Sequence, residues 1–392
     1  MFVRRISIAC TAACILLAGC QSGPKEEVYS RAMEEFAHGE LTVAYVNYGN
    51  TGWYDMMIDE ITSVYRNLMI NSQAYASKNE FITDVTTQLN AGNGPDLFLL
   101  DFATPLSFQK MARNDTYADL TPYLEADSRF TASDYDAFEA GQINGKQYLL
   151  PITYSTFALY TTEENLKKLN LTADDFSDAE KVLAALETAT DYVEKDASLI
   201  PIFPEMSRND VDSFWIDAFD LPVLDFDSKE VVIDKDFYKR AADLSRRIGE
   251  SFLDTHAQRS ELFSDPETLE NSLFVLTNLD KDGWAYYQYY TRMDALGQTA
   301  VRIPLPSYQD ATQIAGYVNL YATVNSNSKN RLLAYETVRI IMDYPWNTYG
   351  GFNGSVLTQK AAFQKSLMGL GGGYQIPWGD EMLTIKEPAA VR

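Results

Sequence analysis

The sequence predicts an α/β protein built from more than one domain. Phe81, Val85 and Leu89 recur at i, i+4 and i+8, which indicates the buried face of a helix over residues 78–90. Beyond a short glycine- and proline-containing turn, residues 97–100 form a continuous apolar run, typical of a strand buried on both faces of a parallel sheet. At 392 residues the chain exceeds one ordinary hydrophobic core, so we expect two domains.

Composition and charge narrow the class of protein. Hydrophobic residues make up 46% of the chain and charged residues 22%, which is ordinary for a folded globular protein and unlike a disordered one. The formal net charge is -23 at pH 7. Nucleic acid is therefore not expected as a partner, because its phosphates would be repelled where a basic surface is needed.

The first residues have the pattern of a targeting sequence. Two arginines precede an apolar run over residues 6–16, which is too short to span a bilayer, and the peptide LAGC follows, ending at Cys20. This arrangement resembles a bacterial lipobox. It predicts a signal peptide at residues 1–19, a lipid-modified Cys20 and a tether over residues 20–39. We therefore expect an extracytoplasmic protein anchored to the bacterial cell membrane by its lipid.

Strands and helices alternate in the first half of the chain. Ser77 and Glu80 fit the S-x-x-E capping box that opens a helix. In such α/β sheets ligands bind beyond the carboxyl ends of the strands. The expected elements are a strand at 41–46, a helix containing Ile58, Ile61 and Leu68, a second strand, a helix at 78–90, a strand at 97–100, and short helices beginning at Thr104 and Thr121.

The second half repeats this alternation. Asn144 and Gly145 form a pair that favours a tight hairpin turn, and an apolar strand follows it and continues through Tyr160. Ser177 and Glu180 fit another capping box. The further expected elements are helices at 179–193 and 237–248, strands at 274–277, 301–305 and 316–324, and a helix at 330–343.

Three motifs in this order resemble the extracellular solute-binding proteins of ABC importers, family 1, the relatives of maltose-binding protein. They are AG-x-x-PD followed by an apolar run, around Asp96; G-K-x-Y-x-x-P, ending at Pro151; and Ser328-Lys329-Asn330 before a helix. We assign Asp96 a structural role. The resemblance implies a two-lobed periplasmic-binding-protein (Venus flytrap) fold, in which each lobe is a mainly parallel sheet flanked by helices.

The resemblance also implies where the chain passes between the lobes. Few residues follow the glycine cluster at 369–373. The helices that usually close the second lobe in this family contain more residues than that. The expected division is 40–153 with 317–356 for lobe one, 154–316 with 357–392 for lobe two, and hinge crossings near 151–156, 315–318 and 353–358.

Aromatic residues make up 13% of the chain, and several fall where the resemblance places a cleft between the lobes. Aromatic faces suit sugars because a pyranose presents an apolar C–H face, while its hydroxyls need polar partners at the edges. The alternative is a place in the core for Trp53 and Phe102, a helix cap for Asp101, and a solvated ion pair for Glu205 and Arg208. The candidate ligand-binding residues are Tyr48, Trp53, Asp101 and Phe102 in lobe one, Tyr154 and Ser155 at the crossing, Glu205, Arg208, Asn278, Asp280 and Trp284 in lobe two, and Trp378 as a cap.

Catalytic motifs are absent from the sequence. His38 and His256 are its only histidines, and there is no H-E-x-x-H, C-x-x-C, G-x-S-x-G or P-loop motif. The resemblance implies a binding protein and not an enzyme, with no cofactor and no bound metal. A secreted glycan-acting enzyme or adhesin is the rival, because a glycosidase needs only two suitably spaced carboxylates.

The function that the resemblance implies is capture of a small solute by a monomeric receptor that delivers it to the transmembrane subunits of an ABC permease. A mono- or oligosaccharide is the leading ligand. Two others stay open. Tyr286-Tyr287 and Tyr289-Tyr290 resemble the twin tyrosines of ferric-ion binders, and the acidic composition suits a polyamine.

Overall fold

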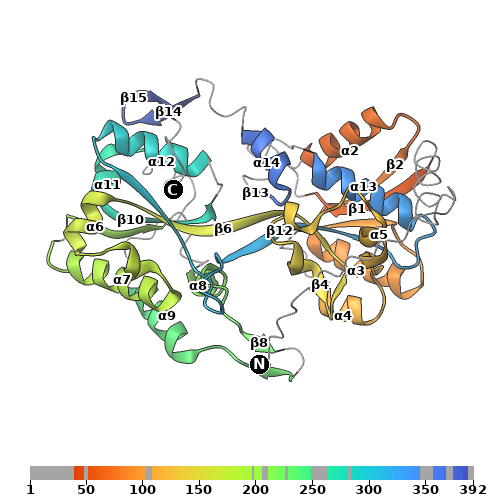
Figure 1. The fold of residues 1–392 in the computed structure, drawn as a ribbon, viewed down its shortest axis with the longest axis horizontal. Coiled ribbons are helices and arrows are strands. Elements are labelled where there is room, and N and C mark those ends of the chain that lie inside the picture. The colour runs from red at the N-terminus through yellow and green to blue at the C-terminus, as the bar shows by residue number, and fades with distance from the viewer. Residues whose placement is uncertain are drawn as a thin grey trace, which may run out of the picture.

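The computed structural model consists of two lobes connected by long strands (Figure 1). The expected signal peptide, Cys20 and most of the tether lie outside the residues that the structure describes. Those residues are 39–47, 52–101, 108–196, 198–204, 211–225, 228–248, 264–280, 284–344, 356–367 and 374–386.

The first lobe is organised around three parallel strands. β1 (Glu40–Val46) lies between β2 (Met69–Tyr75) and β3 (Leu97–Asp101), and both pairings are parallel. β12 (Gly316–Val324) comes back from the second lobe and pairs antiparallel with β3. The strand order β2-β1-β3-β12 gives a sheet whose parallel strands all run toward the second lobe.

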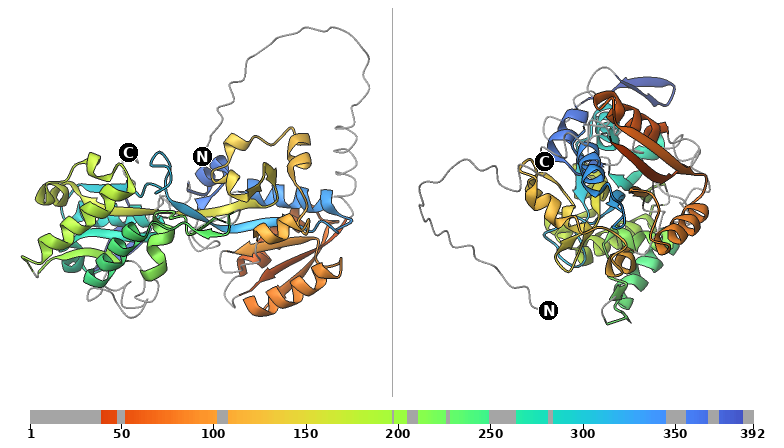
Figure 2. Two further views of the ribbon diagram at one scale, coloured as in Figure 1. Left: turned by 90° about the horizontal axis from the view of Figure 1, so that it is seen from below. Right: turned by 90° about the vertical axis from the view of Figure 1, so that its right-hand side faces the viewer.

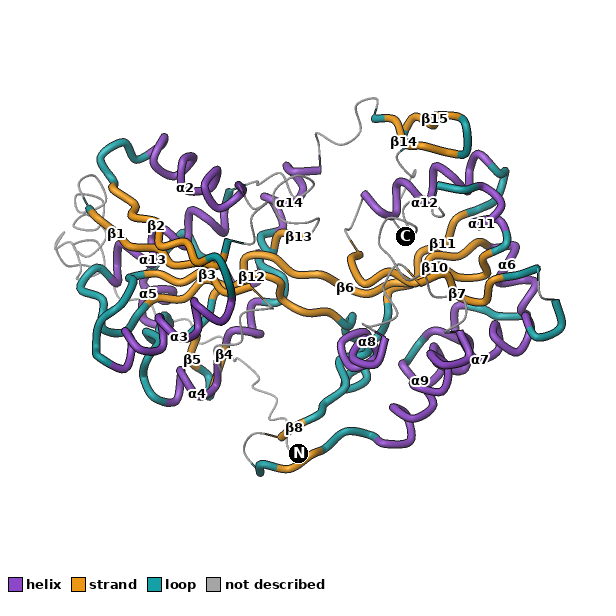
Figure 3. Tube along the Cα trace, turned by 180° about the vertical axis from the view of Figure 1, so that it is seen from behind, coloured by secondary structure: helices purple, strands orange, loops and turns teal. Residues whose placement is uncertain are grey.

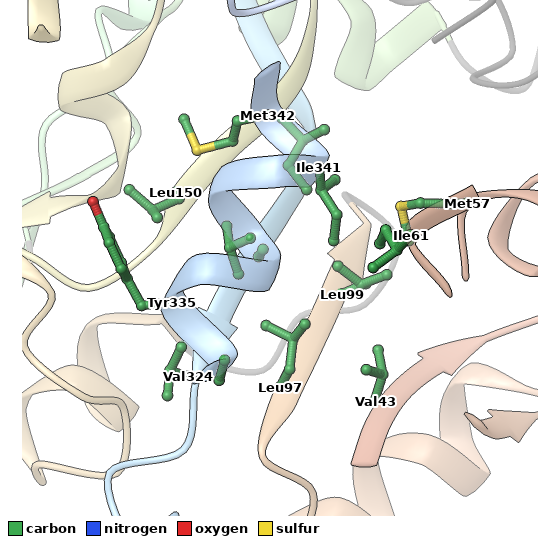
Figure 4. Close-up of a cluster of buried hydrophobic side chains, with 14 of the residues drawn as sticks. Val43, Met57, Ile61, Leu97, Leu99, Leu150, Val324, Tyr335, Ile341 and Met342 are labelled. Carbon is green, nitrogen blue, oxygen red and sulfur yellow. The ribbon is translucent and has the colours of Figure 1, made fainter. Parts of the chain in front are cut away.

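Helices cover both faces of this sheet, because side chains alternate along each strand. Leu97 and Leu99 of β3 belong to the core cluster under α2 and α13, drawn in Figure 4, whereas Phe98 and Leu100 belong to a second cluster under α3. The remaining elements of this lobe are α2 (Gly52–Val64), α3 (Lys78–Asn90), α4 (Phe108–Arg113), α5 (Thr121–Ala126), η1 (Ala132–Asp134), η2 (Phe138–Gly141), α13 (Arg331–Asp343) and the hairpin of β4 (Gln142–Ile143) with β5 (Lys146–Gln147).

The helix predicted at residues 78–90 is present with those bounds as α3. The Ser77 hydroxyl accepts a hydrogen bond from the Glu80 backbone N–H at 3.3 Å, which caps the helix as expected. Phe81, Val85 and Leu89 are its buried residues. The periodicity therefore identified both the helix and its buried face.

Asp96 connects three segments of the first lobe. Its carboxylate accepts hydrogen bonds from the Thr42 backbone N–H at 2.9 Å and from the Ser328 hydroxyl, while its own carbonyl accepts from Asn325 at 3.0 Å. The Ser328 hydroxyl in turn accepts from the Asn330 backbone N–H at 2.9 Å, next to the start of α13. The structural role predicted for Asp96 is confirmed, since it fixes the start of β3 against β1 and α13.

β6 (Leu150–Thr162) is the main connection between the lobes, which lie at the two ends of the long axis of the molecule (Figures 1 and 2). Its first half pairs with β12, and its second half pairs antiparallel with β10 (Ser272–Asp280) and β11 (Ala300–Pro304). Figure 3 shows β6 and β12 running through the middle of the molecule. In the part of the chain that the structure describes, one nine-stranded sheet therefore spans both lobes.

The second lobe has a mixed sheet, although we expected a mainly parallel one. β7 (Ile200–Pro204) is parallel to β10, but β6 enters from the first lobe and so runs against both β10 and β11. The remaining elements of this part of the lobe are α6 (Glu163–Leu169), η3 (Ala173–Phe176), α7 (Ala179–Val193), α8 (Val211–Ala218), α9 (Lys235–Ile248), α11 (Pro266–Glu270), α12 (Trp284–Ala295) and the hairpin of β8 (Leu224–Asp225) with β9 (Glu230–Val231).

Two hydrophobic clusters cover the two faces of the second-lobe sheet. Phe157 and Leu159 of β6 point to a cluster with α7, α8 and α9. Ala158 and Tyr160 point to the opposite cluster, which contains residues of α12. The alternation along β6 thus supplies one residue to each core in turn.

The last part of the chain departs from the expected division. β13 (Val356–Leu357) pairs with β6, and α14 (Lys360–Leu367) packs Ala362 on the first-lobe core. We expected lobe two from residue 357 and a hinge at 353–358, but the apolar side chains of Leu357 and Ala362 are buried in lobe one. Among the described residues of this segment, only β14 (Gln375–Trp378), β15 (Glu381–Thr384) and the residues beside them lie on the second lobe.

Candidate functional site

The carboxyl ends of the first-lobe strands face the second lobe. Asp101, the last residue of β3, lies opposite Leu320 of β12, and Leu320 is two residues from Val318, which lies opposite Tyr154 of β6. Because β1 is parallel to β3, its carboxyl end lies at the same edge of the sheet. α2 and α4 are the next helices along the chain after β1 and β3.

The second lobe presents its strand ends to the same crossing. Asp280, the last residue of β10, lies opposite Thr156 of β6. Pro204, the last residue of β7, lies opposite Leu276 on the same strand β10. α8 and α12 follow these two strands. Carboxyl ends of parallel strands from both lobes therefore meet around β6 and β12, which is where ligands bind in α/β sheets.

Most of the predicted ligand-binding residues belong to this edge by their place in the chain. Trp53 lies in the first turn of α2, Trp284 begins α12, and residues 278 and 280 lie at the end of β10. Their side chains are outside the described part of the structure, as is the whole of each of four other predicted residues: Tyr48, Phe102, Glu205 and Arg208.

Tyr154 is described in full and has a partner within the protein. Its hydroxyl donates to the Asp136 carboxylate at 3.1 Å, and Asp136 also pairs with Lys360 at 3.3 Å. The Asp136 backbone N–H donates to the Thr358 carbonyl at 2.8 Å. These contacts connect Tyr154 to the segment that joins β13 and α14, so its ring lies on the first-lobe side of the crossing.

Ser155 faces the opposite side of β6 and is 0% exposed. Its hydroxyl accepts a hydrogen bond from Asn319 Nδ2 at 2.7 Å. Burial and the charge of Asp217 together raise the pKa of Tyr317 to about 12, although a hydrogen bond with Ser155 opposes the rise. In this structure Ser155 therefore contacts the neighbouring strand, and ligand contact stays a prediction for it.

Asp217 and Asp220 were not predicted from the sequence. Asp217 lies in the last turn of α8, which packs beside β12, and Asp220 follows just after the helix. The charge of Asp217 acts on Tyr317. Burial raises the pKa of the Asp217 carboxyl, and the Asp220 carboxylate raises it further. Asp220 accepts a hydrogen bond from the Ser307 hydroxyl at 3.1 Å. No motif marks these two acids, because pairing α8 with β12 depends on the tertiary fold.

Trp378 lies in the core of the second lobe and not on a surface that faces the first. Its side chain is 7% exposed and belongs to the cluster that contains Tyr160, Tyr289 and Met293. The sequence-based expectation that Trp378 caps a cleft disagrees with this position. An indole enclosed by α12 and β6 has no free face for a ligand.

One member of each tyrosine pair in α12 is a packing residue. Tyr286 and Tyr289 are buried, and Tyr160 of β6 lies 5.3 Å from Tyr289 between ring centroids. Burial raises the pKa of both phenols. Since a ferric ion is held by ionised phenolates, these two side chains are unsuited to that role. Among the described residues, no group of three or more His, Cys, Asp or Glu is placed to hold a metal.

A separate cavity of about 250 Å³ lies at the opposite end of the first lobe. Two of its lining residues have charged contacts: Asp119 pairs with Lys146 at 3.2 Å, and Arg331 donates to the Ser326 carbonyl at 2.7 Å. Its lining contains none of the predicted ligand-binding residues; it consists of Asp115, Tyr117, Ala118, Asp119, Tyr123, Ser326 and Arg331.

Two α/β lobes whose strand ends meet at shared crossing strands define a receptor of the ligand-binding class. The chain belongs to the bacterial extracellular solute-binding protein family, whose model matches residues 57–258. It is therefore a solute-binding protein of an ABC transporter, located outside the cytoplasm, and not an enzyme. In the part of the chain that the structure describes, no helix is long and apolar enough to cross a membrane.

Solved structures show the same fold at low sequence identity. The sugar-binding protein MalE from Xanthomonas citri matches with a TM-score of 0.59 and 14% identity, covering 84% of this chain and 82% of its own. A family 1 extracellular solute-binding protein from Alicyclobacillus acidocaldarius gives 0.58 and 12%, with coverages of 85% and 81%. A sugar transporter from Rhizobium etli in an open conformation gives 0.56 and 16%, with coverages of 88% and 85%. No curated protein matches the chain.

Proposed function

We propose that this chain is a lipid-anchored receptor that captures a carbohydrate between its two lobes and delivers it to the transmembrane subunits of an ABC permease. The observation that carries the proposal is the meeting of strand ends around the crossing: β3 from the first lobe, with β7 and β10 from the second. A solute bound there contacts both lobes, so it favours the conformation in which they approach each other.

The residue types at this edge support a carbohydrate. Trp53 and Trp284 open the helices that follow β1 and β10, one on each lobe. Asp101 and Asp217 add carboxylates near the crossing, and carboxylates accept hydrogen bonds from sugar hydroxyls. Two of the similar structures are described as a sugar-binding protein and a sugar transporter.

The other ligands have less support. Burial of Tyr286 and Tyr289 counts against ferric ion, since both phenols are enclosed in the second-lobe core. A polyamine is supported only by the net charge of -23, and charge by itself does not build a site. Family membership removes the secreted enzyme from the candidates.

A thermal-shift screen of the purified protein tests the proposal. The panel contains monosaccharides, linear oligosaccharides, spermidine and ferric citrate. A ligand that binds only the folded protein stabilises it by RT ln(1 + [L]/Kd), which is about 2.7 kcal/mol at a hundredfold excess over Kd. We expect a saturable rise in melting temperature with at least one carbohydrate.

Two controls make the outcome decisive. Sodium chloride at matched ionic strength removes non-specific effects of spermidine, and citrate alone removes effects of the ferric carrier. A shift with spermidine or ferric citrate and none with any sugar would replace the carbohydrate by that ligand. The absence of any shift across the panel would contradict the capture of a small solute of these classes.

A further inference from the structure

The membership of the two cores locates the pivot between the lobes. On β12, Tyr317 packs against the second-lobe core, and Leu320 belongs to the first-lobe core. On β6, Ile152 belongs to the first-lobe core and Phe157 to the second. Because packed cores move as rigid bodies, bending is confined to the residues between these positions, which are 153–156 on β6 and 318–319 on β12.

The strand pairing is irregular at this pivot. Val318 lies opposite Tyr154 and Leu320 lies opposite Thr153, so Asn319 is an extra residue on β12. Such a β-bulge bends its strand and leaves the extra residue outside the regular ladder. The two crossing strands are therefore joined by fewer backbone contacts where they have to bend.

Side chains replace the missing contacts. Asn319 Nδ2 donates to the Ser155 hydroxyl at 2.7 Å, across the bulge and from one crossing strand to the other. Gly316, three residues earlier, permits close approach, because a Cβ built on it would lie 2.5 Å from the Ser155 carbonyl oxygen. On the other face, the Tyr154 hydroxyl donates to Asp136, and Asp136 pairs with Lys360. These contacts hold Tyr154 to the first lobe.

We propose that the Asn319–Ser155 hydrogen bond is a hinge lock that keeps β6 and β12 together at the bulge, so that they bend as one unit. The lock limits the range of lobe angles in the empty receptor. Its effect on affinity rests on the proposed function. Apparent affinity scales with the fraction of molecules in a binding-competent angle, and a looser hinge lowers that fraction.

Hydrogen–deuterium exchange of the empty mature protein tests the lock without any ligand. Asn319→Ala, Ser155→Ala and the double variant are compared with the unaltered chain. In each we expect roughly fivefold faster exchange in peptides covering 151–157 and 315–321, as for loss of one neutral hydrogen bond. The double variant should equal the single variants, since both remove the same bond.

Small-angle scattering of the same variants measures the range of lobe angles, which we expect to broaden. The matched control is Thr323→Val on β12, because it removes the buried hydrogen bond from the Thr323 hydroxyl to the Tyr148 carbonyl, 2.8 Å, inside the first lobe. This control should leave the scattering and the pivot peptides unchanged. Gly316→Ala is a second test, and its Cβ should push the strands apart and shift the mean angle.

Three outcomes would contradict the proposed role of the Asn319–Ser155 hydrogen bond: unchanged deuterium exchange at the pivot, additive effects in the double variant, or faster exchange throughout both lobes. The last would show that Asn319 and Ser155 only support packing. If no carbohydrate binds in the thermal screen, the proposed function fails, while these ligand-free measurements still decide whether the lock exists.

Discussion

Asp127 is the buried centre of a charge cluster in the first lobe, formed with Arg129, Glu336 and Arg339. Its side chain is 0% exposed, pairs with Arg129 at 2.9 Å and Arg339 at 3.3 Å, and Arg129 also reaches Glu336 at 2.8 Å. Burial alone would raise the pKa of Asp127. Hydrogen bonds from Arg129 and the charges of Arg129 and Arg339 outweigh burial and lower the pKa to about 2.

This shift predicts acid sensitivity. The pKa of Asp127 is about 2 when folded and 3.8 as the ordinary value, so the unfolded chain binds the proton more readily. The stabilisation is therefore present above pH 4 and is lost as the pH falls toward 2. We expect Asp127→Asn to lower the free energy of unfolding by about 3 kcal/mol at pH 7. About 2 kcal/mol of that difference should disappear by pH 2.

Urea unfolding at a series of pH values measures both effects. The control is Asp134→Asn, because Asp134 is exposed on η1 in the same stretch of chain. A difference between Asp127→Asn and the unaltered protein that stays constant from pH 7 to pH 2 would show that the charge cluster does not lower the pKa of Asp127.

Single residues also show where local sequence rules stop. The capping box predicted at Ser177 is wrong by one residue: Asp178 caps α7, with its carboxylate accepting from the Lys181 backbone N–H at 2.9 Å. Serine and aspartate are both favourable N-cap residues, and the backbone conformation of the turn decides between them.

The hairpin turn predicted at Asn144 and Gly145 is confirmed, because both have the positive φ that such a turn needs.

At the scale of elements, the C-terminal hairpin of β14 and β15 covers α12 of the second lobe. Arg292 of α12 donates to the Pro377 carbonyl at 3.3 Å, and the Lys386 backbone N–H donates to the Thr291 hydroxyl at 2.9 Å. Trp378 supplies the buried anchor. The hairpin thus holds α12 against the sheet.

Trp378→Ala should therefore destabilise the second lobe. Removing a buried indole leaves a cavity and costs about 3 kcal/mol or more. We expect the second-lobe peptides of α12 and β10 to exchange deuterium much faster, with little change in β1 and β3. Met382→Ala on the same hairpin is the matched control, because Met382 is 54% exposed. Equal effects in both variants would show that the hairpin does not anchor α12 through Trp378.

At the scale of the whole molecule, binding and packing tryptophans should behave differently. Trp284 begins α12 at the edge that faces the first lobe. We expect Trp284→Ala to weaken binding of the best carbohydrate in the thermal screen at least tenfold, or roughly 1.4 kcal/mol. Calorimetry of the empty protein should show little change in melting temperature. Normal binding together with much earlier melting would place Trp284 in the core.

The matched control for Trp284 is Tyr374→Ala. Tyr374 is also aromatic, lies just before β14 on the second lobe and is 44% exposed. Its removal should change neither binding nor melting appreciably. Equal loss of binding in both variants would indicate a general effect of losing an aromatic side chain.

The proposed lipid anchor would attach the protein to the membrane through Cys20, which lies outside the residues that the structure describes. If Cys20 is the lipidation site, Cys20→Ala removes the sulfur atom to which the lipid would be attached. We expect the variant to be released from the membrane fraction or to stay unprocessed, as seen by fractionation and immunoblotting. Ser22→Ala, beside the site, should stay anchored. Membrane-bound, lipid-labelled Cys20→Ala protein would contradict the lipid anchor.

The order of strands and helices could be predicted from the sequence, because each depends on neighbours within a few residues. The buried face of α3 is of this kind. The return of β12 to the first lobe was implied by the family resemblance, and the contacts of Asp96 join segments that are far apart in the sequence. The sequence also predicted that Trp53, Asp101 and Trp284 lie near the carboxyl ends of strands, because each of them follows or ends a predicted strand in the chain. Side chains that meet across distant segments could not be placed in this way.

Tertiary structure alone decided which lobe takes each ambiguous segment. Leu357 and Trp378 are both apolar residues of short strands, yet one completes the first core and the other the second. Nothing local distinguishes them, because burial depends on the shape of the space left by the rest of the fold. The same holds for Ser155 and Asn319, which are far apart in sequence and meet only because β12 returns beside β6.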